Sequence, residues 1–183
     1  GSTNNATLST EGIAVTLVFV DSTQGWLITD DGLQSVAVTN PYLQATGGTV
    51  TESGNCKIHT FTGPGTFCVS KIATSATDNL VSYMVVAGGG GGGGSASGYY
   101  SAGGGGAGGF REVVSPGSPY TGSPLDGYPS SPNRITVTAT AFPIVVGAGA
   151  SGGAGHPACG SRSNGGDGGV STFSTITSAG GGG

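Results

Sequence analysis

The side chains best suited to chemistry are two histidines and three cysteines, and their spacing builds no catalytic or metal site. His59 lies in a strand-like segment, and no nearby serine or cysteine sits on a nucleophile turn that would complete a hydrolytic triad. His156 and Cys159 offer two ligands to a metal ion, whereas a zinc site needs three or four protein ligands. We therefore expect no catalytic residue, no metal and no cofactor.

The acidic pair Asp30–Asp31 has the composition of a general acid–base site, but its context indicates a turn. Gly32 follows the pair directly, and Asp-Asp-Gly between two strand-like segments is ordinary tight-turn chemistry. The glycine runs match the pattern GxGxxG trivially, yet no strand–GxGxxG–helix unit and no Gly-Lys-Ser/Thr accompanies them. The sequence thus indicates a non-enzymatic protein without a nucleotide site.

The three cysteines, Cys56, Cys68 and Cys159, could be free thiols or could form a disulfide bridge. Cys56 and Cys68 flank a predicted hairpin with a four-residue turn at 62–65, whose register puts the two sulfurs on opposite faces and forbids a bridge between them. Free thiols that pack as small hydrophobic groups are one interpretation. A Cys56–Cys159 bridge and an intermolecular bridge are the others.

Aromatic residues and one asparagine are the candidate contact and modification sites. Tyr120 and Tyr128 lie in a proline-rich segment, and we predict that they are exposed and contact a glycan partner by stacking on sugar rings. We expect Tyr99 and Tyr100, which interrupt glycine, to pack between glycine segments. Asn5, in Asn-Ala-Thr, is the single acceptor sequence for an N-linked glycan.

Composition narrows the class of protein. A net charge of −4 with only five Lys and Arg residues argues against nucleic acid and anionic membrane as partners. No stretch of eighteen apolar residues is present, so we expect no membrane insertion. Charged residues make up 8% of the chain, against roughly 25% in ordinary soluble domains. Because no window shows an uninterrupted helical period, we predict an all-β protein that depends on backbone hydrogen bonds.

Residues 1–54 form the first predicted domain, a short-strand β meander with few glycines. Ile13–Val20 is a continuous apolar strand, and Trp26–Thr29 and Leu33–Thr39 follow as shorter strands. Since Ile13–Val20 is apolar on both faces, three short strands cannot cover it. We expect it to be buried against another copy of the chain or a further sheet. The candidate inter-subunit residues are Ile13, Val15, Leu17 and Phe19.

Residues 55–183 form the second predicted domain, which is dominated by glycine; the whole chain holds 40 glycines in 183 residues. Glycine arrays can be flexible linkers, or they can form extended helices of three residues per turn that pack with their backbones touching. Tyrosine, phenylalanine and valine punctuate these arrays, which favours the packed alternative. The predicted scaffold residues are Gly88, Gly91, Gly94, Gly103 and Gly106. Residues 115–133 are proline-rich and are predicted to form an exposed loop.

Five blocks of the second domain carry a resemblance to a known family: Ile58–Phe67, Tyr83–Gly94, Gly103–Arg111, Ile135–Gly149 and Ser171–Gly183. In this order they resemble the glycine-rich domain of bacteriophage tail-fibre and receptor-recognising adhesin proteins. The resemblance implies a sandwich of polyglycine II helices whose variable loops contact the host surface. The long proline-rich insertion departs from the family pattern, and the chain stops where the family usually continues with more glycine. Ala14–Leu27 is similar to segments of structural proteins from marine tailed phages.

These observations predict a non-enzymatic structural fibre protein with a surface-attachment role. We expect it outside the cell, as a virion tail fibre or a secreted cell-surface filament. Its expected partners are copies of itself, as a trimer or a helical polymer, and a host-surface glycan. The alternative is a self-polymerising, glycosylated extracellular fibril subunit, joined by donor-strand exchange of its N-terminal strand and without a receptor-binding role.

Overall fold

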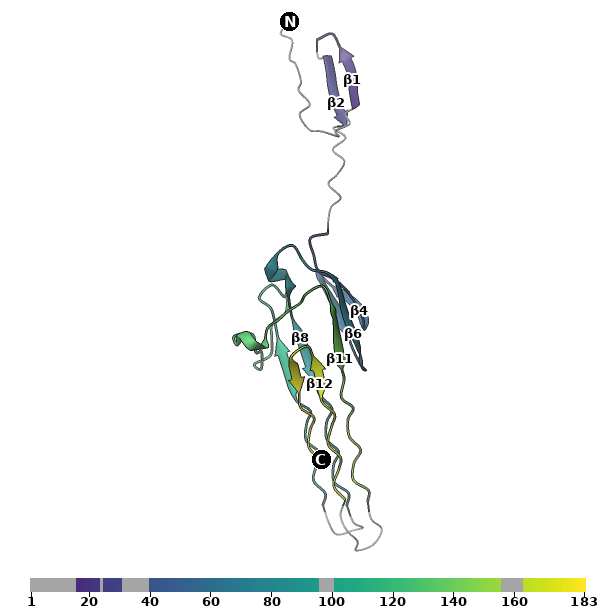
Figure 1. Ribbon diagram of the computed structural model, residues 1–183, viewed down its shortest axis with the longest axis vertical. Helices are drawn as coiled ribbons and strands as arrows, with labels where there is room; N and C mark the ends of the chain where they lie inside the picture. The colour runs from purple at the N-terminus through teal and green to yellow at the C-terminus, as the bar shows by residue number, and fades with distance from the viewer. Residues whose placement is uncertain (1–15, 24, 31–39, 96–100, 156–162) are drawn as a thin grey trace. The chain divides into compact units, whose positions relative to one another are not determined.

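The computed structural model describes residues 16–23, 25–30, 40–95, 101–155 and 163–183 and divides the chain into two units, Gly1–Pro41 and Tyr42–Gly183 (Figure 1). The described residues contain β-strands, two short 3-10 turns and extended segments. The predicted all-β class is confirmed. No helix among these residues is long and apolar enough to cross a membrane.

The first unit contains an antiparallel ribbon of two strands, β1 (Thr16–Asp21) and β2 (Gly25–Asp30). Asp21 helps to close the turn between them, because its carboxylate accepts a hydrogen bond from the backbone N–H of Thr23 at 2.7 Å. The ribbon matches the first two predicted strands of the meander. The third, Leu33–Thr39, lies outside the described residues.

The second unit is built on a five-stranded antiparallel sheet and three two-stranded pairs. The sheet has the order β13-β12-β11-β6-β3, and the pairs are β4-β5, β7-β10 and β8-β9. The strands are β3 (Gln44–Thr46), β4 (Thr49–Ser53), β5 (Cys56–Thr60), β6 (Gly65–Lys71), β7 (Leu80–Val81), β8 (Tyr83–Val86), β9 (Phe110–Val113), β10 (Ile135–Thr136), β11 (Ala141–Val145), β12 (Ser171–Phe173) and β13 (Ile176–Ser178). The 3-10 turns are η1 (Ala76–Asn79) and η2 (Ser131–Asn133).

The second unit begins earlier in the sequence than the expected boundary between residues 54 and 55. Strand β3 pairs with β6, and β4 pairs with β5, so residues 42–54 contribute strands to the second unit. The division at Pro41 therefore follows the pairing of strands, whereas the predicted division followed the change in glycine content.

The predicted hairpin between Cys56 and Cys68 is wrong. Strand β5 pairs with β4, where Cys56 lies opposite Ser53, while β6 lies between β11 and β3. The loop at 61–64 therefore carries the chain from one sheet to another instead of folding it back on itself. Cys56 and Cys68 are free thiols, and Cys56 is partly buried whereas Cys68 is exposed. Cys159 lies outside the described residues.

The core of the second unit is small and aromatic. Alternation along the strands points Phe67 and Val69 of β6, and Tyr83 and Val85 of β8, to the interior. The Phe173 ring meets the rings of Phe67 and Tyr83 edge-to-face, with centroids 6.2 and 5.9 Å apart. The other core members are Val113, Ile135, Val137 and Ile176.

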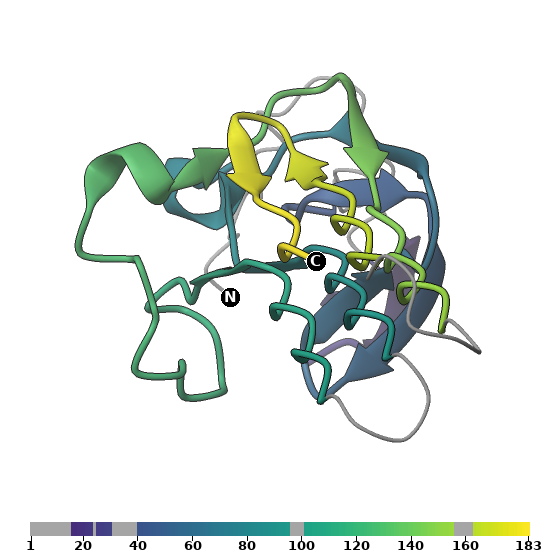
Figure 2. The same cartoon turned by 90° about the horizontal axis from the view of Figure 1, so that it is seen from below.

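Five glycine-rich segments extend directly from this core. Segment 1 (87–95) follows β8, segment 2 (103–109) precedes β9, segment 3 (147–155) follows β11, segment 4 (163–169) precedes β12, and segment 5 (179–183) follows β13. Figure 1 shows them running side by side below the sheets, and Figure 2 shows them end-on as adjacent coils. We call this group of segments the glycine bundle.

Candidate functional site

The glycine bundle is held together by backbone hydrogen bonds that repeat every three residues. The N–H groups of Ala87, Gly90 and Gly93 in segment 1 donate to the carbonyls of Gly109, Gly106 and Gly103 in segment 2, at 2.8–3.0 Å. The N–H groups at 88, 91 and 94 donate to segment 4 in the same rhythm, at 2.8–2.9 Å. Three residues per turn is the period of the extended left-handed helix, so the segments are polyglycine II helices.

Segment 1, whose residues 88–94 are all glycine, has neighbouring segments on several sides. Besides its bonds to segments 2 and 4, it accepts N–H groups from segment 3 at Gly89 and from segment 5 at Gly88, both at 2.9 Å. A Cβ added at Gly88, Gly91 or Gly94 would lie closer than 3.0 Å to a carbonyl of segment 3. None of the described bundle glycines has a positive φ, so the requirement is for space and not for left-handed backbone.

The predicted scaffold residues therefore have two different environments. Gly88, Gly91 and Gly94 lie on the face of segment 1 that touches segment 3. Gly103 and Gly106 accept hydrogen bonds from segment 1, but a Cβ at Gly103 would meet nothing within 4 Å. Glycine is thus sterically required at particular positions of segment 1, whereas a Cβ at Gly89 or Gly93 would make only ordinary contacts, and segment 2 likewise has open positions.

A second period-three signal in the sequence marks the outside of the bundle. Side chains recur every third residue along segments 3 and 4, and these residues are exposed. They are Ala148, Ser151 and Ala154 in segment 3, Asn164 and Asp167 in segment 4, and Val170 directly after segment 4. This spacing, which the sequence analysis did not use, marks positions whose side chains are exposed to solvent, although Gly149, Gly152 and Gly166 between them are exposed as well.

The proline-rich loop at 115–133 is anchored to the core by polar side chains. The Glu112 carboxylate accepts hydrogen bonds from the backbone N–H and the hydroxyl of Ser123. The Asp126 carboxylate accepts the backbone N–H groups of Val114 and Tyr128, both at 3.0 Å. The loop is therefore held in one conformation by charge-assisted hydrogen bonds, although it contains little regular structure.

The two candidate contact tyrosines of this loop lie in different surroundings. The Tyr120 side chain is 49% exposed, and burial and the nearby Glu112 carboxylate raise the pKa of its phenol. Tyr128 instead packs against the core, and the Arg134 guanidinium lies 4.2 Å from its ring centroid. Tyr128 is thus partly buried, and its role as a contact residue stays a prediction. Leu125, which the sequence analysis did not single out, is 68% exposed on the same loop.

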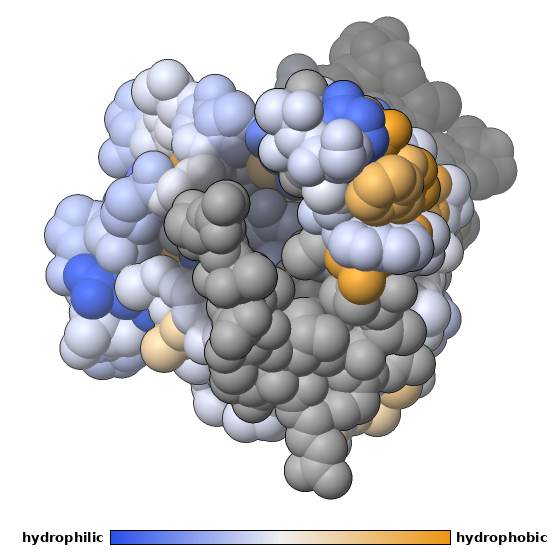
Figure 3. All heavy atoms as spheres, turned by 90° about the horizontal axis from the view of Figure 1, so that it is seen from above, coloured by the Kyte–Doolittle hydropathy of each residue, from blue (hydrophilic) through white to orange (hydrophobic). Residues whose placement is uncertain are grey.

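The N-terminal ribbon presents apolar side chains on both faces of β1. Leu17, Val18, Phe19 and Val20 are each between 46% and 52% exposed, and Trp26 on β2 is 65% exposed. Phe19 and Trp26 contact each other edge-to-face, with ring centroids 5.4 Å apart. Figure 3 shows hydrophobic side chains at the surface at this end of the chain. Ile13 and Val15, the other predicted inter-subunit residues, and Asn5 lie outside the described residues.

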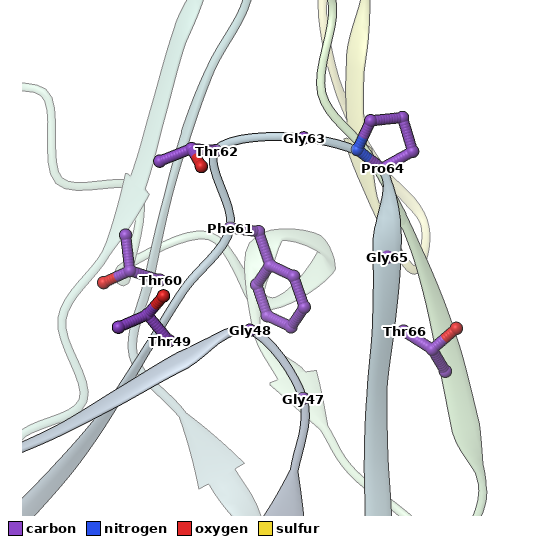
Figure 4. A pocket seen from close by; sticks show the side chains of 10 residues that line it. All are labelled: Gly47, Gly48, Thr49, Thr60, Phe61, Thr62, Gly63, Pro64, Gly65 and Thr66. Carbon is purple, nitrogen blue, oxygen red and sulfur yellow. The ribbon is translucent and has the colours of Figure 1, made fainter.

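A groove separates two turns of the second unit (Figure 4). One wall is the Gly47–Gly48 turn between β3 and β4, and the other is the 61–64 loop between β5 and β6. The groove has a volume of about 390 Å³ and is lined by Gly47, Gly48, Thr49, Thr60, Phe61, Thr62, Gly63, Pro64, Gly65 and Thr66. The Phe61 ring stands between the two walls.

Among the residues that the structure describes, no group of three or more His, Cys, Asp or Glu side chains could hold a metal ion.

A family model for the glycine-rich domain matches residues 60–183. The chain belongs to this glycine-rich domain family. The match begins at Thr60 in the groove and spans all five glycine segments, which confirms the predicted glycine-rich domain. The N-terminal ribbon lies outside the matched residues. No curated protein and no solved structure gives a significant match to the chain.

Proposed function

We propose that this glycine-rich domain protein is a non-enzymatic structural subunit of an extracellular fibre, with a role in surface attachment similar to that of a tail-fibre adhesin. The observation that carries the proposal is the hydrogen-bonded glycine bundle. Most backbone N–H groups of segment 1 donate to neighbouring segments, and a Cβ at Gly88, Gly91 or Gly94 would overlap a neighbouring backbone, so the bundle interior consists of backbone. Such a core provides stiffness and length and leaves no interior side chains for catalysis.

The attachment role rests on the loop at 115–133. Glu112 and Asp126 fix its backbone, while Tyr120 and Leu125 remain exposed. Large apolar side chains on an anchored loop lose little conformational freedom when they contact a partner. Tyr120 is therefore the residue of this loop that we assign to contact with a host-surface glycan.

A second candidate function is favoured by the N-terminal ribbon. Leu17, Val18, Phe19 and Val20 expose both faces of β1, and a two-stranded ribbon is marginally stable alone in water. Pairing or packing of this ribbon with another copy would cover those side chains. The protein would then be a self-polymerising filament subunit joined through its N-terminal strand, with no receptor-binding role.

Negative-stain micrographs of the purified full chain test both candidates. Short closed oligomers of uniform length support the attachment fibre, and filaments of indefinite length with a helical repeat support the self-polymerising subunit. Particles that remain single globular chains at high protein concentration would contradict both. The symmetry of class averages gives the number of copies directly.

A further inference from the structure

The glycine bundle has two layers, and one of its outer faces is made of glycine backbone. Segment 1 bonds to segments 2 and 3 on its two sides, and segments 4 and 5 bond to each other and to segment 1 (Figure 2). Segment 2 also bonds to segment 5, and segment 3 to segment 4. Segments 1–3 therefore form one layer, with a face turned away from segments 4 and 5. We call it the open face; it includes Gly89, Gly92, Gly149 and Gly152, which are exposed or partly exposed.

Packing within one copy does not explain why the open face is glycine. Among the described residues, a Cβ added at Gly89 would have one neighbour within 4 Å, the Gly106 carbonyl oxygen at 3.6 Å. A Cβ added at Gly149 would meet only the Gly89 carbonyl oxygen, at 3.8 Å. Both are ordinary contacts. At Gly88 and Gly91, which face into the bundle, an added Cβ would lie 2.0 Å from a carbonyl oxygen.

Other exposed positions of the bundle do carry side chains. Ala148, Ser151 and Ala154 recur along segment 3, and Asn164 and Asp167 along segment 4. In segment 3 the positions that directly follow, at 149, 152 and 155, are all glycine. Open space by itself therefore does not lead to glycine in this chain. Glycine on the open face indicates that another backbone approaches it closely.

The open face also presents backbone hydrogen-bonding groups without a partner. With three residues per turn, the N–H groups of segment 1 point in three directions, and two of these reach segments 2 and 4. The third set, at Gly89 and Gly92, has no acceptor within the described part of the chain. The carbonyls of Gly90 and Gly93 accept no N–H group there either. Donors and acceptors thus repeat every third residue, at the spacing that holds the bundle together.

The partner of this face must repeat backbone donors and acceptors every three residues and must lack Cβ atoms at the contact. The open face of a second copy meets both requirements. Segments 1, 2 and 3 also contain no charged residue, in a chain of net charge −4, whereas segment 4 presents the exposed Asp167. Two copies that meet through their open faces therefore bring no like charges together.

We propose that two copies of the chain dock through their open faces, so that segments 1–3 of one copy pack on segments 1–3 of the other as polyglycine II helices. A two-fold axis in the interface, at right angles to the segments, brings the N–H groups of each copy opposite the carbonyls of the other. Such a contact closes on itself and gives pairs. The inference rests on the proposed assembly from copies of the chain and names a surface for it that is separate from the N-terminal ribbon.

Gly149→Glu tests the open face, and Ala148→Glu is its matched control. Both residues are exposed in segment 3, but consecutive residues of a three-residue helix point in different directions, and only Gly149 belongs to the open face. The measurement is amide exchange of the full chain at Gly89 and Gly92 as the protein concentration rises from micromolar to millimolar. Exchange should slow about tenfold or more in the wild type and in Ala148→Glu. It should stay fast in Gly149→Glu, because docking would bury an unpaired carboxylate.

Exchange at Gly88 and Gly91, whose N–H groups donate within one copy, reports whether each variant keeps its bundle. If Gly149→Glu loses this protection, Gly89→Ala replaces it, because it adds one methyl group at ordinary contact distance and is followed at Gly92. The proposal is overturned if exchange at Gly92 in the wild type does not depend on concentration, or if the open-face variant that keeps its bundle slows like the wild type.

Micrographs of the same samples separate this outcome from a failure of the proposed function. Fibres without concentration-dependent slowing at Gly92 would remove the docking and leave the structural role intact. Slowing at Gly92 in a chain that forms compact pairs and no fibres would support the docking and contradict the fibre.

Discussion

Gly91 lies on the face of segment 1 that packs against segment 3. A Cβ at this position would overlap the Ser151 carbonyl, which is backbone and cannot turn aside. The Gly91 N–H also donates to the Gly166 carbonyl at 2.9 Å. We predict that Gly91→Val destabilises the folded state by about 3 kcal/mol or more, because overpacking forces apart two hydrogen-bonded backbones. The midpoint of urea unfolding measures the loss.

Gly104→Ala is the control for this prediction. Gly104 lies on segment 2 with nothing within 4 Å of an added Cβ, and its φ is not in the left-handed region. Alanine there restricts the unfolded chain and should leave stability unchanged or raise it by about 0.4–1 kcal/mol. Equal losses at Gly91 and Gly104 would mean that the glycines act through backbone flexibility and not through packing.

We predict that the stability of the second unit falls at alkaline pH because of Tyr83. Its hydroxyl donates to the Asn133 carbonyl at 2.6 Å, and burial raises the pKa of the phenol above its usual value near 10. The unfolded chain therefore loses this proton at a lower pH than the folded chain. Between the pKa of the unfolded chain and that of the folded chain, the unfolded state binds fewer protons. The contribution of Tyr83 to the free energy of unfolding is therefore fully present below pH 10 and falls as the pH rises beyond it.

Urea midpoints measured from pH 7 to pH 11 check this prediction. Tyr83→Phe should cost about 1 kcal/mol at pH 7 through the lost hydrogen bond and should make the alkaline decline shallower. The same slope in both proteins would show that Tyr83 does not contribute to the decline.

Individual residues also show what sequence can and cannot predict. Tyr120 and Tyr128 are equivalent in the sequence, since each lies in the same proline-rich segment. They differ in the structure because Arg134, which follows the loop, covers Tyr128. No local pattern encodes that contact. The uninterrupted run at 88–94, in contrast, does predict close backbone packing, although it does not show which of its glycines a neighbouring carbonyl touches.

At the scale of elements, the apolar ribbon makes the sharpest prediction. Leu17 and Val18 are consecutive residues of β1, so their side chains point to opposite faces and both are nearly half exposed. Leu17→Asp combined with Val18→Asp places a charge on each face. If the ribbon joins copies of the chain, the double variant should abolish assembly, because a buried unpaired carboxylate is strongly unfavourable.

Val50→Asp is the matched control for the ribbon. Val50 lies on β4 in the second unit and is 45% exposed, close to the exposure of Leu17 and Val18. Analytical ultracentrifugation of the three proteins compares their assembly. A double variant that assembles like the wild type would exclude the ribbon as the inter-chain strand and would leave the filament alternative without its main support.

Strand positions were more predictable than strand partners. The apolar segments around β1, β8, β9 and β11 follow from residue type and spacing, because alternation and β-branched residues mark a strand wherever it pairs. The pairing of β5 with β4 instead of β6 could not be read in the same way. Short loops favour hairpins, but Phe61 packs against Gly47, Gly48 and Gly65 and directs the chain into the other sheet.

For the molecule as a whole, the second unit joins its sheets and its glycine bundle into one hydrogen-bonded structure. The β8–β9 ladder continues without a break into segments 1 and 2, since the Ala87 N–H donates to the Gly109 carbonyl at 2.9 Å. The Ser178 hydroxyl ties β13 to the Val85 carbonyl at 2.8 Å. The bundle therefore cannot separate from the core without breaking these contacts, and we expect both to unfold cooperatively.

Amide hydrogen exchange within segment 1 tests that cooperativity residue by residue. The N–H groups of Gly88, Gly91 and Gly94 donate to segment 4, so they should be protected to the same degree as Val85 in the core. Gly89 and Gly92 have no acceptor for their N–H groups among the described residues and should exchange faster.

A pattern of protection with a period of three, inside a run of seven identical residues, can come only from packed helices of three residues per turn. Uniformly fast exchange across this run would mean that the glycines are a linker. Uniformly slow exchange would mean that a further backbone covers the open side of segment 1 in the assembled fibre. Comparing the chain at low and high concentration then distinguishes protection within one copy from protection that arises on assembly.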